Sequence, residues 1–186
     1  MRIKTRFNSG SFIFFSMSCV LIMSGALFLA GARINTSPSI PVGLYWLSNQ
    51  PVKKGEYVIF CPPETAIFKQ ALARGYLPIG FCPLGSTYLM KQVVATTGDR
   101  IAISSEGVVI NGHPLAFSKP LLKDSKGRPL SIWEVSNYRL KSLEVLLMTN
   151  QSPLSFDARY FGLLTKTELM TVIKPIIVWV NAQKGK

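Results

Sequence analysis

Histidine and acidic side chains are scarce in this chain, and the scarcity limits its chemistry. The 186 residues include one histidine and nine aspartate or glutamate residues. With so few ligands, and with cysteine spacing unlike any zinc pattern, we expect no metal and no cofactor. The histidine, His113, follows Asn111-Gly112 and precedes a proline, which is typical of a solvated turn. A nucleophilic serine here would therefore need a base other than histidine.

Cysteine is also rare. Cys19 lies within a long apolar segment, while Cys61 and Cys82 each stand in a Phe-Cys-Pro triplet farther along the chain. In an oxidising compartment we expect Cys61 and Cys82 to form a disulfide. It would close a loop of about 20 residues, worth roughly 3 kcal/mol in the chain-entropy model.

The net charge is +12, but no basic run is interleaved with aromatic residues. A nucleic-acid-binding protein would concentrate its positive charge, so we expect no nucleic-acid partner. The scattered lysines and arginines favour a basic domain near anionic lipid headgroups.

Charge is absent from Ser11 to Ala32, and basic residues precede that stretch. Twenty-two residues in a helix reach roughly 30 Å, the thickness of a bilayer core. The sequence thus predicts a cytoplasmic N-terminus (1–10), a transmembrane anchor (11–32) and an exported domain (33–186). A cleaved signal peptide is the alternative, because Ala30-Gly31-Ala32 has the small-x-small form of a cleavage site. Either reading exports the remainder.

The exported part is predicted to be mainly β, with short irregular strands. Apolar runs rich in β-forming residues, and the turns between them, give strands at 43–47, 57–60, 87–95, 100–103, 108–110, 145–148 and 172–180. The stretch 65–74 predicts a helix, with Thr65 at its start as the cap and Gly75 as the residue that stops it. A second short helix is expected at 165–170, and 119–128 is a polar loop.

Two residues could form a catalytic pair. Lys91 lies within an apolar strand with no charge close in sequence, and burial would lower its pKa from about 10.4. The alternative is a strand lysine that faces solvent. Ser39 lies between Pro38 and Pro41 in a rigid loop just after the apolar segment. The alternative is that this loop is only a stiff linker between the apolar segment and the domain that follows it.

Four motifs, in order, resemble those of the type I signal peptidases, and more closely the TraF-type peptidases of conjugative plasmid transfer. Residues 39–45 (Ser-Ile-Pro-Val-Gly-Leu-Tyr) are similar to the nucleophile motif in its conjugative form. Residues 55–60 (Gly-Glu-Tyr-Val-Ile-Phe) resemble the glycine-aspartate-x-valine strand. Residues 91–99 resemble the general-base motif, and residues 155–162 the last motif, serine-x-aspartate-serine-arginine-tyrosine-x-glycine.

The resemblance implies a signal-peptidase-like, irregular β-domain with one or two short helices, and assigns roles to particular residues. Ser39 would be the nucleophile and Lys91 its general base, with Asp157 as a third catalytic residue. The Ser39 N–H and the Ser37 hydroxyl would bind the oxyanion. Three further residues would support the site structurally: Gly98, Asp99 and Arg159.

The departures from the family motifs concern the surroundings of the base. Gln92 replaces an arginine, and Ala158 replaces a serine whose hydroxyl can help to hold the lysine. The hydrogen-bond partner of Lys91 is therefore unassigned. Asp157 is either a catalytic carboxylate or half of a structural ion pair with Arg159.

The implied function is a membrane-anchored Ser-Lys endopeptidase of the bacterial inner membrane, with its catalytic domain in the periplasm. Its substrate would be a pilin precursor, processed to a linear or a cyclic product, and proteins of the conjugation apparatus are further possible partners. One alternative is a general signal peptidase that removes leader peptides. Another is a non-catalytic component of the secretion channel.

Overall fold

The structure is a computed structural model that describes residues 9–149 and 151–179. The chain divides into two compact units, Met1–Arg33 and Ile34–Lys186. The first contains α1 (Ser9–Leu29), an uncharged helix of 21 residues. Among the residues described, no helix has both the length and the apolar character needed to cross a membrane.

The second unit is mainly β, as the sequence predicts. Its larger sheet is formed by β1 (Ala32–Asn35), β2 (Gly43–Ser48), β3 (Tyr57–Phe60), β4 (Leu89–Ala95), β9 (Glu144–Met148), β10 (Leu164–Thr165) and β11 (Thr171–Val178). A smaller sheet contains β5 (Arg100–Ser104), β6 (Gly107–Ile110), β7 (His113–Pro114) and β8 (Val135–Arg139). The short helices are α2 (Ala66–Ala73), α3 (Ala158–Phe161) and the 3-10 turn η1 (Lys166–Glu168).

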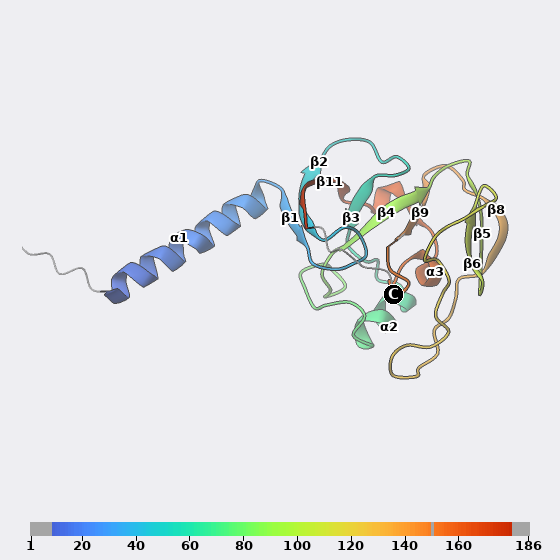
Figure 1. Cartoon of the computed structure of the whole chain (residues 1–186), viewed down its shortest axis with the longest axis horizontal. Helices are drawn as coiled ribbons and strands as arrows, with labels where there is room; N and C mark the ends of the chain where they lie inside the picture. The colour runs from blue at the N-terminus through green and yellow to red at the C-terminus, as the bar shows by residue number, and fades with distance from the viewer. Residues whose placement is uncertain (1–8, 150, 180–186) are drawn as a thin grey trace, which may run out of the picture. The chain divides into compact units, whose positions relative to one another are not determined.

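The larger sheet has the order β1-β2-β11-β3-β4-β9-β10 within the described part of the chain. β4, the strand that carries Lys91, is an inner strand between β3 and β9 (Figure 1). Val58 of β3 is opposite Lys91, and Leu147 of β9 is opposite Val93. Since both neighbours are antiparallel and apolar, the backbone of β4 is held on both sides and its side chains are drawn into the core.

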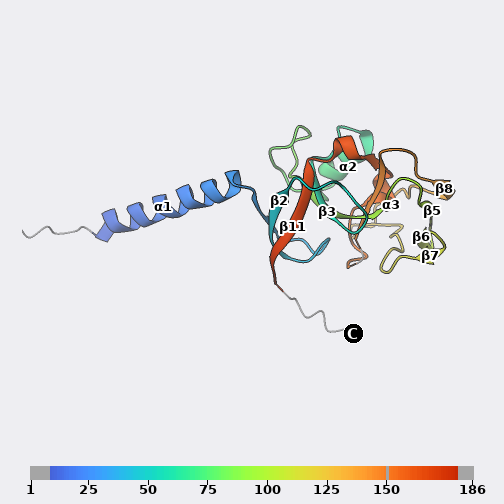
Figure 2. The ribbon, with the colours of Figure 1, turned by 90° about the horizontal axis from the view of Figure 1, so that it is seen from above.

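The first and last long strands of the sheet lie side by side. β11 pairs with β2 from Val172 opposite Ser48 to Val178 opposite Gly43, with a register shift between Pro175 and Ile177 (Figure 2). Proline has no N–H to donate, so an irregularity at this point is expected. The pairing fixes the C-terminal end of the loop that contains Ser39, which enters β2 at Gly43.

The smaller sheet contains the two strands predicted at 100–103 and 108–110, with β7 and β8 in addition. Asn111 has a positive φ of 51° and continues with Gly112 into the turn that joins β6 to β7. Figure 1 places β5, β6 and β8 together at one side of the domain. Buried Ile101 and Ile103 of β5 pack in one cluster with Leu146 of β9. The two sheets therefore share a core.

Helix α2 and the Cys61–Cys82 disulfide lie close together in sequence. Phe68 and Ala71 of α2 are buried in a cluster with Phe60 of β3. Cys61, one residue after β3, forms a disulfide with Cys82, with their Cα atoms 5.5 Å apart. The bridge fixes the segment that leads from α2 back to β4.

Several boundaries differ from those predicted, for physical reasons. The stretch 165–170 forms only the 3-10 turn η1, and β11 ends at Val178, while residue 180 is outside the described residues. β8 was not predicted because its sequence, Val-Ser-Asn-Tyr-Arg, has no apolar run; pairing with β5 holds it. Helix α3 is too short for any periodic pattern to reveal.

Candidate active site

Ser39 is presented by a loop that one buried asparagine organises. The Asn35 side-chain amide donates to the carbonyl oxygens of Ser37 (2.8 Å), Ile40 (3.0 Å) and Pro41 (3.1 Å). Its Oδ1 accepts the N–H of Ser37 at 3.1 Å. A single side chain thus satisfies four backbone groups that the irregular loop cannot pair for itself.

The loop is also anchored to the core on the far side of Ser39. Ile40 is 1% exposed and packs with Tyr45 and Met90. The Tyr45 hydroxyl donates to the Pro41 carbonyl at 2.6 Å. Because the residue that follows Ser39 is buried while Ser39 is only half-buried, the serine is held at the rim of the core.

Lys91 is buried, not solvent-facing: it is 3% exposed. Its Nζ donates to Ser39 Oγ at 2.8 Å. Burial disfavours the charged form and lowers the pKa of Lys91 from 10.5 to about 8, although the nearby Asp157 carboxylate opposes the shift. With a pKa of about 8, roughly a tenth of the molecules carry a neutral lysine at pH 7, against fewer than one in a thousand for an ordinary lysine.

Ser155 is the hydrogen-bond partner of Lys91 that the sequence left unassigned. Its Oγ accepts from Lys91 Nζ at 2.9 Å and lies 3.4 Å from Ser39 Oγ, to which it donates. Both serine hydroxyls therefore meet the same amine, and Ser155 directs the amine toward Ser39. Ala158, at the position where the family serine was expected, is buried in an apolar cluster.

Asp157 and Arg159 form a fully buried ion pair. Arg159 Nε donates to Asp157 Oδ1 at 2.8 Å, and Nη2 donates to Oδ2 at 2.9 Å; both side chains are 0% exposed. Asp157 also caps α3 by accepting the N–H of Arg159. Both carboxylate oxygens are thus occupied by Arg159 itself.

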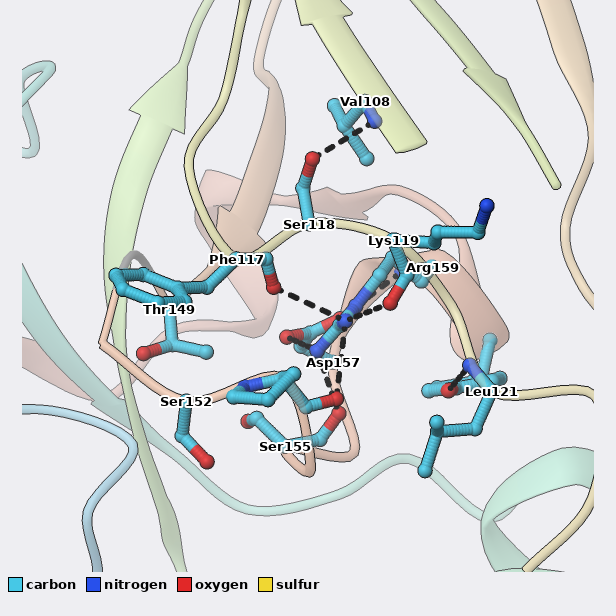
Figure 3. A network of polar contacts seen from close by, with 12 residues as sticks. Val108, Phe117, Ser118, Lys119, Leu121, Thr149, Ser152, Ser155, Asp157 and Arg159 are labelled. Atoms are coloured by element: carbon cyan, nitrogen blue, oxygen red, sulfur yellow. Dashed lines mark hydrogen bonds and ion pairs between the residues drawn. The ribbon is translucent and has the colours of Figure 1, made fainter. Parts of the chain in front are cut away.

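The other guanidinium protons of Arg159 are shared among backbone carbonyls (Figure 3). Nη2 donates to the carbonyl of Ser155 at 3.0 Å. Nη1 donates to three carbonyl oxygens, those of Phe117, Lys119 and Pro153. Arg159 therefore ties the backbone of Ser155 to the segment that passes over it at 117–119.

The predicted oxyanion donors are adjacent and bonded to each other. Ser37 Oγ donates to Ser39 Oγ at 2.9 Å, and the Ser39 N–H donates to Ser37 Oγ at 3.2 Å. A substrate oxygen that accepted from both groups would replace this internal contact. A cavity of about 330 Å³ opens here, lined among others by Ser37, Ser39, Tyr88, Met90 and Lys91.

Other residues singled out from the sequence make contacts elsewhere. Asp99 accepts hydrogen bonds from the Thr96 N–H and from Asn111, and the Gly98 N–H donates to Leu140, so both hold the turn between β4 and β5. His113 is exposed in the smaller sheet. Among the described residues, no three histidine, cysteine or acidic side chains gather as a metal site would require.

Sequence reasoning missed the roles of Ser155 and Asn35. Ser155 did carry a signal, because it opens the motif that contains Asp157. Its contact with Lys91 spans 64 positions and cannot be read from local pattern. Asn35 precedes the proline-rich loop as a plain polar residue.

The chain is similar to several known proteins of plasmid and conjugal transfer. The chain is 49% identical to a plasmid transfer protein TraF of Escherichia coli over 159 residues, which cover 86% of this chain and 90% of that one. It is 34% identical over 164 residues to a conjugal transfer protein TraF of Agrobacterium fabrum, covering 86% and 91%. A crystal structure of a signal peptidase I from Enterococcus faecalis matches with a TM-score of 0.37 and 15% identity, over 67% of this chain and 98% of that one.

The family model described as signal peptidase, peptidase S26, matches residues 6–179, nearly the whole chain. The match includes the Ser39 loop, the Lys91 strand and the segment from Ser155 to Arg159. The chain therefore belongs to the signal peptidase family, peptidase S26, and its relatives include TraF proteins of plasmid and conjugal transfer.

Proposed function

We propose that this chain is a serine endopeptidase in which Ser39 is the nucleophile and Lys91 its general base. The observation that carries the proposal is the 2.8 Å contact between Lys91 Nζ and Ser39 Oγ, made by a lysine that is 3% exposed. Neutral Lys91 takes the proton of Ser39 as Oγ attacks the scissile carbonyl. The Ser39 N–H and the Ser37 hydroxyl stabilise the oxyanion, and Lys91 then protonates the leaving amine.

The substrate that we propose is a pilin precursor of a conjugation apparatus. The support is the similarity to proteins named for plasmid and conjugal transfer, together with the conjugative form of the Ser39 motif. The acyl-enzyme would then be resolved by water, or by the N-terminal amine of the same pilin, which closes a circle. Intact mass distinguishes these products, because the cyclic one is lighter by one water.

Asp157 supports this chemistry from a distance in our proposal. Its carboxylate is buried and both oxygens are bonded to Arg159, so in this arrangement it does not meet an incoming amine. We assign it the role of a positioning residue. It neutralises Arg159, which in turn holds the backbone of Ser155 beside Lys91.

The proposed location is the periplasmic face of the bacterial inner membrane. The uncharged residues 11–32 and the basic residues before them support an anchor whose N-terminus is cytoplasmic. The Cys61–Cys82 disulfide is consistent with an oxidising compartment for the catalytic domain.

Replacement of either member of the Ser39–Lys91 pair should abolish processing. We expect Ser39→Ala and Lys91→Ala to leave a co-expressed candidate pilin at its precursor mass, as read by intact mass spectrometry.

Ser155→Ala should retain activity but lose about ten- to a hundredfold in kcat/KM, because Lys91 loses the hydrogen bond that orients it. The matched control is Ser104→Ala, at an exposed position of β5. Processing by the Lys91→Ala protein would contradict the pair.

The pH dependence should reveal the lowered pKa of Lys91. Only the neutral amine can accept the serine proton, so kcat/KM should increase with pH and level off above about 8, the pKa of Lys91. Below that pH, activity should fall tenfold for each pH unit as the lysine becomes protonated. Steady-state rates on a fluorogenic peptide from pH 6 to 10 measure this. Activity that still increased tenfold for each pH unit up to pH 10 would place the acid limb near the ordinary lysine pKa and would contradict the lowered pKa of Lys91.

Asp157→Asn should weaken the fold and change the pH profile together. Removing the carboxylate leaves Arg159 buried and unpaired, which should reduce the free energy of unfolding by about 3–5 kcal/mol. The Asp157 carboxylate raises the pKa of Lys91, so its loss should move the acid limb to lower pH. Urea unfolding and the pH profile provide the two measurements. Glu106→Gln, which removes an exposed carboxylate, should change neither, and an unmoved acid limb in a folded Asp157→Asn protein would argue against the electrostatic link.

The oxidation state of the cysteines tests the proposed location. In a Cys19→Ser background, the full-length chain from cells should resist thiol labelling at Cys61 and Cys82 until it is reduced. The same chain without residues 2–32, retained in the cytoplasm, should label at both positions because that compartment keeps thiols reduced. Mass shifts of the unfolded, non-reduced proteins provide the measurement. Labelling of the full-length chain at both cysteines would indicate that its domain lies in the cytoplasm, which would contradict the proposed location.

A further inference from the structure

A second cavity, distinct from the one that Ser39 and Lys91 line, has Ser155 among its lining residues. It has a volume of about 280 Å³, and its walls are mainly leucine and aromatic side chains. They come from the strap, which we define as residues 117–130, from the segment 154–160, and from Tyr76 just after α2. The principal apolar contributors are Tyr76, Leu121, Leu130, Leu154 and Phe156.

Ser155 is the link between this cavity and the catalytic pair. It lines the cavity, and its Oγ lies 2.9 Å from Lys91 Nζ and 3.4 Å from Ser39 Oγ. The cavity that Ser39 and Lys91 themselves line does not include Ser155. One cavity is therefore lined by the catalytic pair itself, and the second is linked to the pair through Ser155.

The path of the proton indicates which cavity binds the acyl side of the scissile bond and which binds the amine side. In acylation, Ser39 Oγ bonds to the carbonyl carbon, the C–N bond breaks, and the proton taken from Ser39 moves through Lys91 Nζ to the leaving nitrogen. In deacylation, an attacking amine gives its proton to Lys91 Nζ, and Ser39 Oγ recovers a proton as its bond to carbon breaks. In both steps the substrate nitrogen has to lie beside Lys91 Nζ. Besides Ser39, Lys91 Nζ contacts the hydroxyl of Ser155.

We propose that the cavity beside Ser155 is the subsite for the residue on the amine side of the bond. It holds the first residues of the leaving peptide in acylation, and those of the attacking amine when the acyl group passes to an amine. This assignment rests on the proposed Ser39–Lys91 mechanism. It leaves the cavity lined by Ser37, Tyr88 and Met90 to the acyl part of the substrate.

The walls of the subsite favour an uncharged, apolar side chain. Asp124 is the charged residue among those that line it, and its carboxylate is already engaged. Its Oδ1 accepts the N–H groups of Lys126 and Arg128, and its Oδ2 accepts from the Tyr76 hydroxyl (2.5 Å) and from Arg128 Nε (2.6 Å). A charged substrate side chain would therefore lose water without gaining a partner, whereas an apolar one would cover Leu154, which is 76% exposed.

The subsite is formed before any substrate arrives, because the strap is fixed at several points. Tyr160 accepts the N–H of Leu121 at 2.9 Å. Arg74 donates to the carbonyl of Pro129 at 2.8 Å, while Arg128 donates to the carbonyl of Arg74 at 3.1 Å. Arg159 holds the start of the strap, as Figure 3 shows. A preformed pocket requires little ordering when it binds a side chain.

The test separates the amine side from the acyl side. Full-length protein in detergent is given an acyl-pentapeptide methyl thioester ending in alanine, whose methanethiol leaving group has no side chain to fill the subsite. Leucinamide, glycinamide or aspartamide is added as the attacking amine above pH 8, and hydrolysis and amide products are separated by mass. Rates obtained with Ser39→Ala are subtracted to remove uncatalysed aminolysis.

We expect the wild-type enzyme to favour leucinamide over glycinamide by about tenfold, and to use aspartamide least. Leu154→Ser should reduce the preference for leucinamide to about threefold or less. Ser125→Trp, which fills the cavity, should remove the preference in the same way. Leu122→Ser is the matched control, since Leu122 is 62% exposed on the strap but does not line the cavity.

The outcomes distinguish this inference from the function on which it rests. If wild type consumes the thioester no faster than Ser39→Ala does, the proposed mechanism itself fails. If wild type consumes it through Ser39 but makes no amide product, shows no preference for leucinamide, or keeps that preference in both Leu154→Ser and Ser125→Trp, the subsite assignment is overturned.

Discussion

The buried pair of Asp157 and Arg159 is the interaction on which the candidate site depends. An unpaired guanidinium in the core would be prohibitively costly, and Asp157, two positions earlier, provides a bidentate partner within the same short segment. Arg159 then has donors left for carbonyls of the strap and for Pro153 and Ser155. One ion pair thereby sets the path of two irregular segments that have no strand or helix of their own to hold them.

The same pair determines how far the pKa of Lys91 falls. Desolvation lowers that pKa, the Asp157 carboxylate raises it and Arg159 lowers it again. Burial is the largest of these three effects and Arg159 opposes Asp157, so the pKa of Lys91 falls to about 8. A lone carboxylate next to the lysine would form a salt bridge and keep it protonated. Arg159 thus allows an acidic residue to lie close to the lysine that we propose as the general base, which has to lose its proton.

The mainly β fold was predicted from local pattern, whereas the pairing of Ser39 with Lys91 was implied by the resemblance of four motifs to those of the signal peptidases. Local pattern left open whether Lys91 faces the core or the solvent, because side chains alternate between the two faces of a strand; in the structure Lys91 is 3% exposed. Ser155 and Asn35 could not be assigned in this way, since their roles come from tertiary contacts: Ser155 meets a lysine 64 positions away. β8 and α3 were missed for a related reason, being short elements that pairing and capping hold in place without a periodic pattern.

The alanine at position 158 has a physical explanation in this arrangement. Its side chain is fully buried against Leu146 and Met148, where a hydroxyl would need a partner. Lys91 Nζ already contacts two hydroxyls, those of Ser39 and Ser155. Ser155 stands three positions before Ala158 in the sequence, with Asp157 between them. A serine at position 158 is therefore not required to orient the base. Instead, the carbonyl of Ser155 is held by Arg159, so the orientation of the base depends on the ion pair and not on the residue between its two members.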